Sequence, residues 1–203
     1  MFIKQEKIFI SILFIFFVFI FGITLCISVR MEKNNEYSLI SNIAEAKIIN
    51  IGNEEVLGLP FKLIIPSIKV NSNIDPVGLT KDGAMDLPLK SSNTGWYNLG
   101  PIPGVIGSSV IDGHSGFKNG APAVFDNLHK IKIGDKVTII NNKGNATIFI
   151  VHKISKYDFS ANATNIFTST DGKIHLNLIT CTGTWNSILK SHNSRLVVFT
   201  DKE

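Results

Sequence analysis

Hydrophobic and polar positions divide this chain of 203 residues into two parts. An apolar run covers Ile8–Val29, about 22 residues without a charged side chain, which suffices to cross a bilayer at about 1.5 Å rise per residue. Beyond residue 58, apolar residues come in short runs that are separated by Gly, Pro, Asn and Asp. The first pattern predicts a transmembrane helix, and the second predicts a domain that consists mainly of strands.

These patterns predict the domain organisation. We expect a short tail at 1–7, a transmembrane signal anchor at 8–29, a polar stalk at 30–58 and a folded domain at 59–203. The anchor is expected to stay attached, because no small-residue cleavage site follows it and because the run is long for a signal peptide. The charges that flank the run do not clearly determine which of the two orientations it has in the membrane.

Seven short β-like runs are predicted in the folded domain, at Phe61–Ile65, Ser67–Val70, Ser108–Gly113, Lys136–Asn141, Ala146–Lys156, Lys173–Thr180 and Arg195–Thr200. Asn142–Asn145 reads as a hairpin turn, while Ala123–Lys130 and Ala161–Phe167 are candidates for short helices. Many strands with few helices favour a mainly β fold, either a barrel or a sandwich.

Composition narrows the function classes. The net charge is +4, from 20 basic and 16 acidic residues, and no basic cluster with interleaved aromatic residues is present, so nucleic-acid binding is not expected. Two cysteines and five scattered histidines do not have the spacing of a zinc site. We therefore expect neither a metal site nor a cofactor.

Cys181 is the cysteine that lies outside the apolar N-terminal run. Strand alternation puts Ile174, Leu176 and Leu178 on an apolar face, and Cys181 on the opposite, more polar face at the end of the strand. A buried structural cysteine is the alternative, since free cysteine is often buried. A single exported thiol on a polar face indicates instead a nucleophile that forms a covalent acyl intermediate.

His114 and Arg195 could complete such a site. Gly113 and Gly116 bracket His114, which gives the backbone freedom to present the ring at a turn, and imidazole exchanges protons at neutral pH. Arg195 opens a β-like run and keeps its charge, so it can stabilise a developing oxyanion, although a surface contact is the common role of arginine. The other four histidines are expected to be structural or exposed.

Three motifs together resemble the sortases, membrane-anchored cysteine transpeptidases of Gram-positive bacteria. They are ValIleAspGlyHis at 110–114, LeuIleThrCys at 178–181 and ArgLeuValValPhe at 195–199, and their order and spacing also agree. The segments 121–128 and 134–137 look most like class F of that family. The resemblance covers roughly Leu59–Phe199 and implies a closed, roughly eight-stranded β-barrel.

The resemblance also implies an activity. Cys181 would attack the Thr–Gly bond of a Leu-Pro-x-Thr-Gly-type sorting signal, His114 would transfer protons, and Arg195 would stabilise the oxyanion. Thr180 and Ser115 would contact substrate. The partners would be surface proteins that carry the signal and an amine of a cell-wall precursor, with the catalytic domain outside the cell and the N-terminal helix in the membrane.

The sequence departs from the family pattern at two positions. Asp112 stands where alanine is more common and shares a face with His114, where it would tune the ring or make a local hydrogen bond. Asn177 stands where some relatives have threonine.

Several branches and sites of the family are not expected. The stalk has no Asp-Pro-aromatic lid and no apolar segment follows Glu203, which disfavours the pilin-polymerising branch. Acids occur only at the two ends of the segment 157–171, which disfavours a calcium site. A cysteine peptidase that uses water and an inactive, membrane-tethered peptide-binding barrel remain as alternatives.

Overall fold

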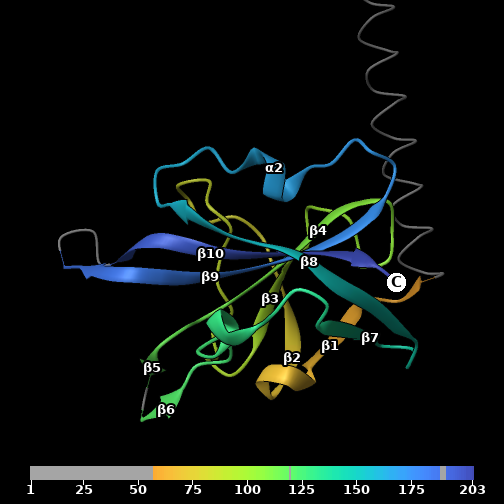
Figure 1. Ribbon diagram of the computed structural model, residues 1–203, viewed down its shortest axis with the longest axis horizontal. Coiled ribbons are helices and arrows are strands. Elements are labelled where there is room, and N and C mark those ends of the chain that lie inside the picture. Colours follow the sequence, from red (N-terminus) through yellow and green to blue (C-terminus); the bar gives the residue numbers. More distant parts are fainter. Residues whose placement is uncertain (1–56, 119, 188–190) are drawn as a thin grey trace, which may run out of the picture. The chain divides into compact units, whose positions relative to one another are not determined.

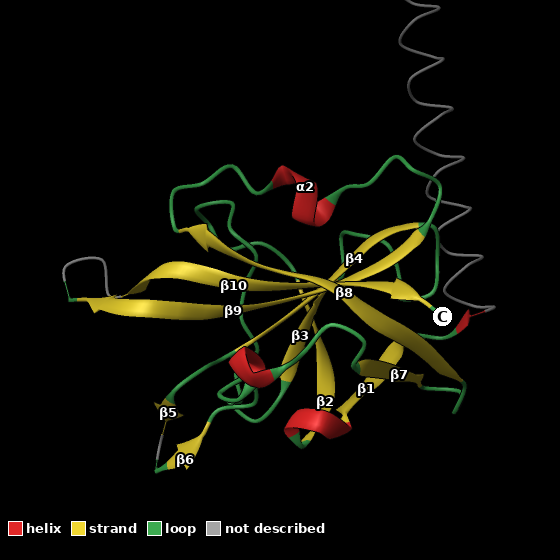
Figure 2. Ribbon diagram, in the orientation of Figure 1, coloured by secondary structure: helices red, strands yellow, loops and turns green. Residues whose placement is uncertain are grey.

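The computed structural model describes residues 57–118, 120–187 and 191–203 of the chain (Figure 1). Strands dominate this part, and the helical segments between them are short (Figure 2). The elements in chain order are β1 (Pro60–Ile65), η1 (Pro66–Ile68), β2 (Val70–Val77), β3 (Thr94–Tyr97), β4 (Gly107–Gly113), β5 (Phe117–Lys118), β6 (Ala121–Pro122), η2 (Leu128–Lys130), β7 (Lys136–Asn141), β8 (Ala146–Asp158), α2 (Thr164–Phe167), β9 (Ile174–Asn186) and β10 (Ser191–Lys202).

Eight of these strands close into a barrel in the order β1-β2-β3-β4-β9-β10-β8-β7, and β7 pairs with β1 to complete the ring. The pairs β2–β3 and β4–β9 are parallel, and the other neighbours are antiparallel. Closure gives each of the eight strands a partner on both sides, so no edge is left open to pair with another chain. The expected eight-stranded β-barrel is confirmed.

The barrel interior holds the main hydrophobic core. Leu176 and Leu178 of β9 are fully buried there, and Ile174 packs against the same cluster, so the predicted apolar face of this strand is confirmed. Leu63 of β1 and Phe149 of β8 are also fully buried in it. Removal of each such side chain from water contributes about 1.5–3 kcal/mol, which makes this core the main source of the barrel's stability.

The β8–β9 connection covers the outer face of the barrel beside β4, β9 and β10. Ile166 of α2 packs there with Val110, Val197 and Phe199 in a second buried cluster. The side-chain amide of Asn177 donates to the carbonyl oxygen of Ile166 at 2.6 Å. The middle of this face is therefore covered, and the buried Asn177 has a backbone partner for its amide nitrogen but none among the described residues for its Oδ1.

The predicted strand at Ser67–Val70 is wrong. Pro66 opens the 3-10 turn η1, and the N–H of Lys69 donates to the carbonyl oxygen of Pro66 at 3.1 Å. Lys69 adopts a left-handed φ of 58°, so β2 starts only at Val70. Strand β3 lacks apolar–polar alternation and was not predicted, and β10 already starts at Ser191, before the predicted run that begins at Arg195.

Other local predictions are confirmed. Strands occur at the remaining six predicted runs, and β9 and β10 extend further than predicted. The turn at residues 142–145 connects β7 to β8, and the N–H of Gly144 donates to the carbonyl oxygen of Asn141 at 3.0 Å. The predicted short helices correspond to η2 and α2.

The expected tail at 1–7, the anchor at 8–29 and nearly all of the stalk lie outside the described residues. Within the part that the structure describes, no helix has the length and apolar character needed to span a membrane.

Candidate active site

Cys181 and Arg195 are brought together by the pairing of β9 with β10. The two residues are direct partners in the antiparallel register, and both are half-buried. Both line one cavity of about 490 Å³ on the outer side of the barrel. Residues that alternate outward on paired strands place their side chains side by side, so the thiol and the guanidinium open onto the same space.

His114 comes to this place through the parallel pairing of β4 with β9. The register runs from Gly107 opposite Ile174 to Asp112 opposite Ile179, and two more residues at the same offset set His114 beside Cys181. The imidazole is half-buried, and its Nε2 lies 3.2 Å from the carbonyl oxygen of Pro88. The three predicted catalytic residues therefore come from three adjacent strands, with His114 next to the cavity lining rather than in it. His114 directly follows β4, but Cys181 lies inside β9 and not at its end as predicted, because the strand continues to Asn186.

Two hydrogen bonds join the histidine turn to the cysteine strand. The hydroxyl of Thr180 donates to the carbonyl oxygen of Gly113 at 2.7 Å, and the hydroxyl of Ser115 donates to that of Cys181 at 2.6 Å. Gly113 and Ser115 flank His114, and Thr180 precedes Cys181, so both bonds join the segment around His114 to the segment around Cys181. Thr180 and Ser115 thus hold the two segments together in this structure, and their contact with substrate stays a prediction.

The guanidinium of Arg195 is held by neutral groups. Its Nη1 donates to the carbonyl oxygens of His192 and Ser194 at 3.1 and 3.0 Å, and its Nη2 donates to the hydroxyl of Ser191 at 3.1 Å. The Phe159 ring, from the β8–β9 connection, lies 4.9 Å from the guanidinium carbon. None of these partners carries a negative charge, so the positive charge of Arg195 remains available to an anionic group.

Asp112 lines the same cavity. Its position near His114 in the sequence did not predict this. It is 6% exposed, and burial raises its pKa to about 8, with a contribution from Asp86 and against a hydrogen bond from the Gly95 backbone. Its Oδ1 has no hydrogen-bond partner among the described residues. Near neutral pH this carboxyl group is mostly protonated and can donate a hydrogen bond.

The remaining walls of the cavity are mainly apolar and come from two loops that sequence reasoning did not assign to the site. The β2–β3 loop supplies Leu79 and Leu87, and the β8–β9 connection supplies Phe159 and Phe167. Leu79, Leu87 and Phe159 are each between 44% and 49% exposed. The feature of the sequence that could have indicated these walls is the presence of large apolar side chains in loops. An apolar cavity with a few polar groups suits a peptide with aliphatic side chains.

Cys181 is the free cysteine of the described part of the chain, and no metal-type cluster includes it. The group of potential metal ligands found in that part is His152, His175 and Asp201, away from this cavity.

Comparisons with known proteins agree with the fold. A family model described as the sortase domain matches residues 63–203. No curated protein matches the chain. Solved structures do match, and the similarities are to sortases of three classes.

Streptococcus agalactiae sortase C1 in complex with MTSET is 23% identical with a TM-score of 0.54, over 70% of this chain and 66% of that one. A lid mutant of Corynebacterium diphtheriae sortase A is 25% identical with a TM-score of 0.55, over 71% and 70%. A Clostridium perfringens sortase D5 transpeptidase is 22% identical with a TM-score of 0.53, over 71% and 78%. The chain thus spans about two thirds of the length of the first of these.

Proposed function

Because the chain belongs to the sortase family, we propose that it is a cysteine transpeptidase with Cys181 as the nucleophile. The observation that carries the proposal is the direct cross-strand pairing of Cys181 with Arg195 above one cavity. The two hydrogen bonds that tie the His114 turn to the Cys181 strand support the inclusion of His114. A thiol, an imidazole and a guanidinium on adjacent strands are the groups that acyl transfer requires.

In the first half of the proposed reaction, the sulfur of Cys181 attacks the carbonyl carbon of the Thr–Gly bond. The carbonyl oxygen becomes an oxyanion, and the Arg195 guanidinium stabilises its charge. The carbon–nitrogen bond then breaks, and His114 supplies the proton that the leaving glycine amine takes away. The product of this half is a thioester between Cys181 and the threonine carbonyl.

In the second half, an incoming amine attacks the thioester carbonyl. His114 accepts the proton of the amine, Arg195 again stabilises the oxyanion, and the carbon–sulfur bond breaks. The Cys181–His114 pair then holds the same single exchangeable proton as at the start, because it gave one proton to the leaving amine and regained one from the incoming amine. The thioester keeps the acyl group activated, so the energy of the cleaved peptide bond is conserved in the new one.

The proposed substrate is a Leu-Pro-x-Thr-Gly-type sorting signal on a surface protein, and the proposed acceptor is an amine of a cell-wall precursor. The apolar loops around the cavity supply suitable surfaces for leucine and proline. The segments at 121–128 and 134–137 favour class F within the family. The apolar run at 8–29 supports a single-pass anchor, and the proposed cell-wall acceptor requires the catalytic domain to lie outside the cell.

The test uses the full chain in a mild detergent with a panel of pentapeptides, in the presence and absence of oligoglycine or a diaminopimelate-type amine. Mass spectrometry should show an acyl adduct on Cys181, and the amine should convert it into a ligated product. The Cys181→Ala variant should form neither species, and His114→Ala should form almost none.

Two other outcomes would replace the proposal. Hydrolysis that no amine diverts would identify a cysteine peptidase. Peptide binding without any adduct, together with unchanged biological activity of Cys181→Ala, would identify a membrane-tethered binding barrel.

A further inference from the structure

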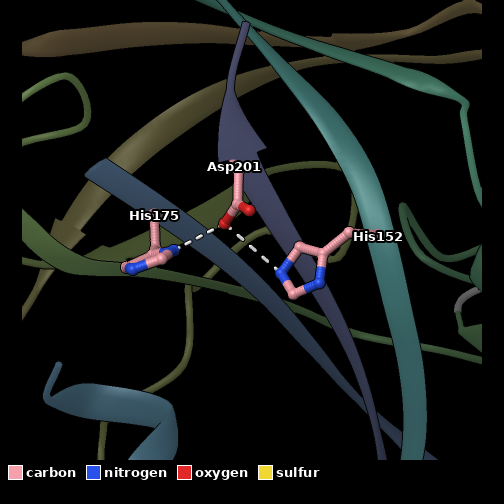
Figure 3. A group of neighbouring side chains, drawn as sticks. All are labelled: His152, His175 and Asp201. Carbon is pink, nitrogen blue, oxygen red and sulfur yellow. Dashed lines mark hydrogen bonds and ion pairs between the residues drawn. The ribbon is translucent and has the colours of Figure 1, made fainter. Parts of the chain in front are cut away.

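Two histidines and an aspartate gather at the end of the barrel opposite to the candidate active site. Strands β8, β9 and β10 carry His152, His175 and Asp201, and one ligand atom from each lies within 4.8 Å of the others. Figure 3 shows both imidazole rings turned toward the Asp201 carboxylate between them. His175 precedes Cys181 by six residues on β9, which is about 20 Å at 3.3 Å per residue, so the two sites are separate.

The sheet register explains how residues far apart in sequence meet here. Asp201 is the direct partner of His175 across β9 and β10. Between β8 and β10, Lys153 pairs with Phe199 and Val151 pairs with Thr200, which leaves His152 as the extra residue of a β-bulge. A bulge re-aims a side chain, and this one directs His152 to the face that holds Asp201.

The distances are close to those of a metal site. Nδ1 of His175 lies 2.6 Å from Oδ1 of Asp201, and Nε2 of His152 lies 3.3 Å from the same oxygen. Two ligands on a tetrahedral ion with bonds of about 2.1 Å are themselves about 3.4 Å apart. The second separation already fits, and the first needs an opening of under about 1 Å.

Asp171, in the β8–β9 connection, supplies an outer-shell partner. Its two carboxylate oxygens lie 3.0 and 3.1 Å from Nε2 of His175. A carboxylate on one imidazole nitrogen fixes the proton there and leaves the other nitrogen to a metal, as is common behind zinc-ligating histidines. Here the other nitrogen is Nδ1, the atom that faces Asp201.

We propose that His152, His175 and Asp201 form a site for a divalent transition-metal ion of the Zn²⁺ type, with Asp171 behind His175. Two neutral imidazoles with two carboxylates balance the charge of such an ion. Nitrogen and oxygen ligands in this number suit Zn²⁺, whereas Ca²⁺ requires six to eight oxygen atoms. The spacing of these residues along the chain gives no sign of the site, because three strands and a bulge assemble it.

The experiment uses the full chain in detergent, without a polyhistidine tag and with the Cys26→Ala and Cys181→Ala substitutions, so that no thiol can bind the ion. Calorimetric titration with Zn²⁺ should show saturation at one ion per chain, and Co²⁺ should give the visible absorption of a tetrahedral site. Ca²⁺ should not compete. Because the variant lacks the nucleophile, the result is independent of the proposed transpeptidase activity.

His152 and Asp201 are the residues to vary, because their side chains are 46% and 40% exposed and their replacement should leave the buried core unchanged. His152→Ala and Asp201→Asn should each weaken Zn²⁺ binding by roughly 100-fold or more, since each removes a ligand. Asp171→Asn should weaken it by about 10–100-fold, the usual effect of an outer-shell change. His129→Ala, at an exposed histidine in η2, is the control and should bind as the parent does.

Two results would overturn the proposal. One is a parent protein that takes up no Zn²⁺ below about 1 mM, which would leave the cluster as an ion pair only. The other is equal binding by the parent, His152→Ala and Asp201→Asn, which would place the ion elsewhere.

Discussion

At the scale of single residues, Arg195 is the candidate catalytic group whose surroundings are defined most fully. Its guanidinium is bonded to backbone carbonyls and a hydroxyl, and it faces the ring of Phe159. The side chain is therefore oriented before substrate arrives. A donor that is already oriented stabilises a developing charge without reorganisation.

Substitution of Arg195 by alanine should lower kcat/KM for peptide cleavage by about 10²–10³-fold, the loss typical of one oxyanion donor. Arg195→Lys should recover only part of this loss, because an ammonium group lacks the planar fork that the present hydrogen bonds hold. Lys156→Ala, an exposed change on neighbouring β8, is the control and should leave kcat/KM unchanged. Full activity of Arg195→Ala would remove Arg195 from the mechanism.

Asp112 also allows a prediction at this scale, about stability and pH. Burial raises its pKa from 3.8 to about 8, so the folded state binds more protons than the unfolded state between these values. Stability should then fall as pH rises from about 4 to about 8, by up to about 1.4 kcal/mol per pH unit. Asp112→Asn imitates the protonated group and should lose this dependence.

Urea unfolding at pH 5, 6.5 and 8 would measure it. The free energy of unfolding of Asp112→Asn minus that of the parent should increase at each step to higher pH, because only the parent loses stability. Asp82→Asn, in an exposed turn, should follow the parent at all three pH values. Parallel curves for Asp112→Asn and the parent would show that this carboxyl group is ionised in the folded protein.

At the scale of elements, the sequence predicted most strands but not what covers them. Periodicity identified the buried face of β9, because Leu176 and Leu178 alternate with more polar residues and therefore share the face that packs into the core. It could not show that α2 covers Asn177, since that contact depends on a loop returning over the sheet. Pro66 and the left-handed Lys69 broke a predicted strand, which is a local backbone effect that apolar patterning does not register.

The contact between β4 and β9 sets the geometry of the candidate site. Thr180→Val removes the buried hydroxyl that donates to the Gly113 carbonyl. The free energy of unfolding should fall by about 0.5–1.5 kcal/mol, the usual net contribution of one hydrogen bond. The cleavage rate should fall as well, because the turn that carries His114 loses one of its two ties.

Comparison with Thr182→Val separates this effect from a general one. Thr182 lies two residues further along β9 and is half-buried, so the same change there should alter both stability and rate much less. Equal effects of the two substitutions on urea unfolding and on kcat would mean that the Thr180 bond has no special role.

At the scale of the whole molecule, the three catalytic candidates were identified in the sequence by their motifs. The fold explains how residues that are distant in the sequence come close together. The parallel β4–β9 pair and the antiparallel β9–β10 pair bring together residues from positions 114, 181 and 195. No local pattern encodes which strands become neighbours in a closed ring. For the same reason the sequence did not reveal the buried state of Asp112 or the cluster around Asp201.

The closed ring also concentrates stability in one core, and paired leucine substitutions can measure this. Leu63 of β1 is fully buried in the main cluster, whereas Leu89, in the β2–β3 loop, is fully exposed. Leu63→Ala should lower the free energy of unfolding by about 2–5 kcal/mol, because it removes buried methyl groups and leaves a cavity. Leu89→Ala should change it by less than about 0.5 kcal/mol.

Urea unfolding followed by tryptophan fluorescence suits this comparison, since Trp96 of β3 is buried in the same cluster as Leu63. If β1 closes the barrel as the β1–β7 register indicates, its loss of packing should lower the midpoint of a single cooperative transition. A separate early transition in Leu63→Ala, with the Trp96 signal unchanged, would instead mean that β1 unfolds independently of the rest of the ring.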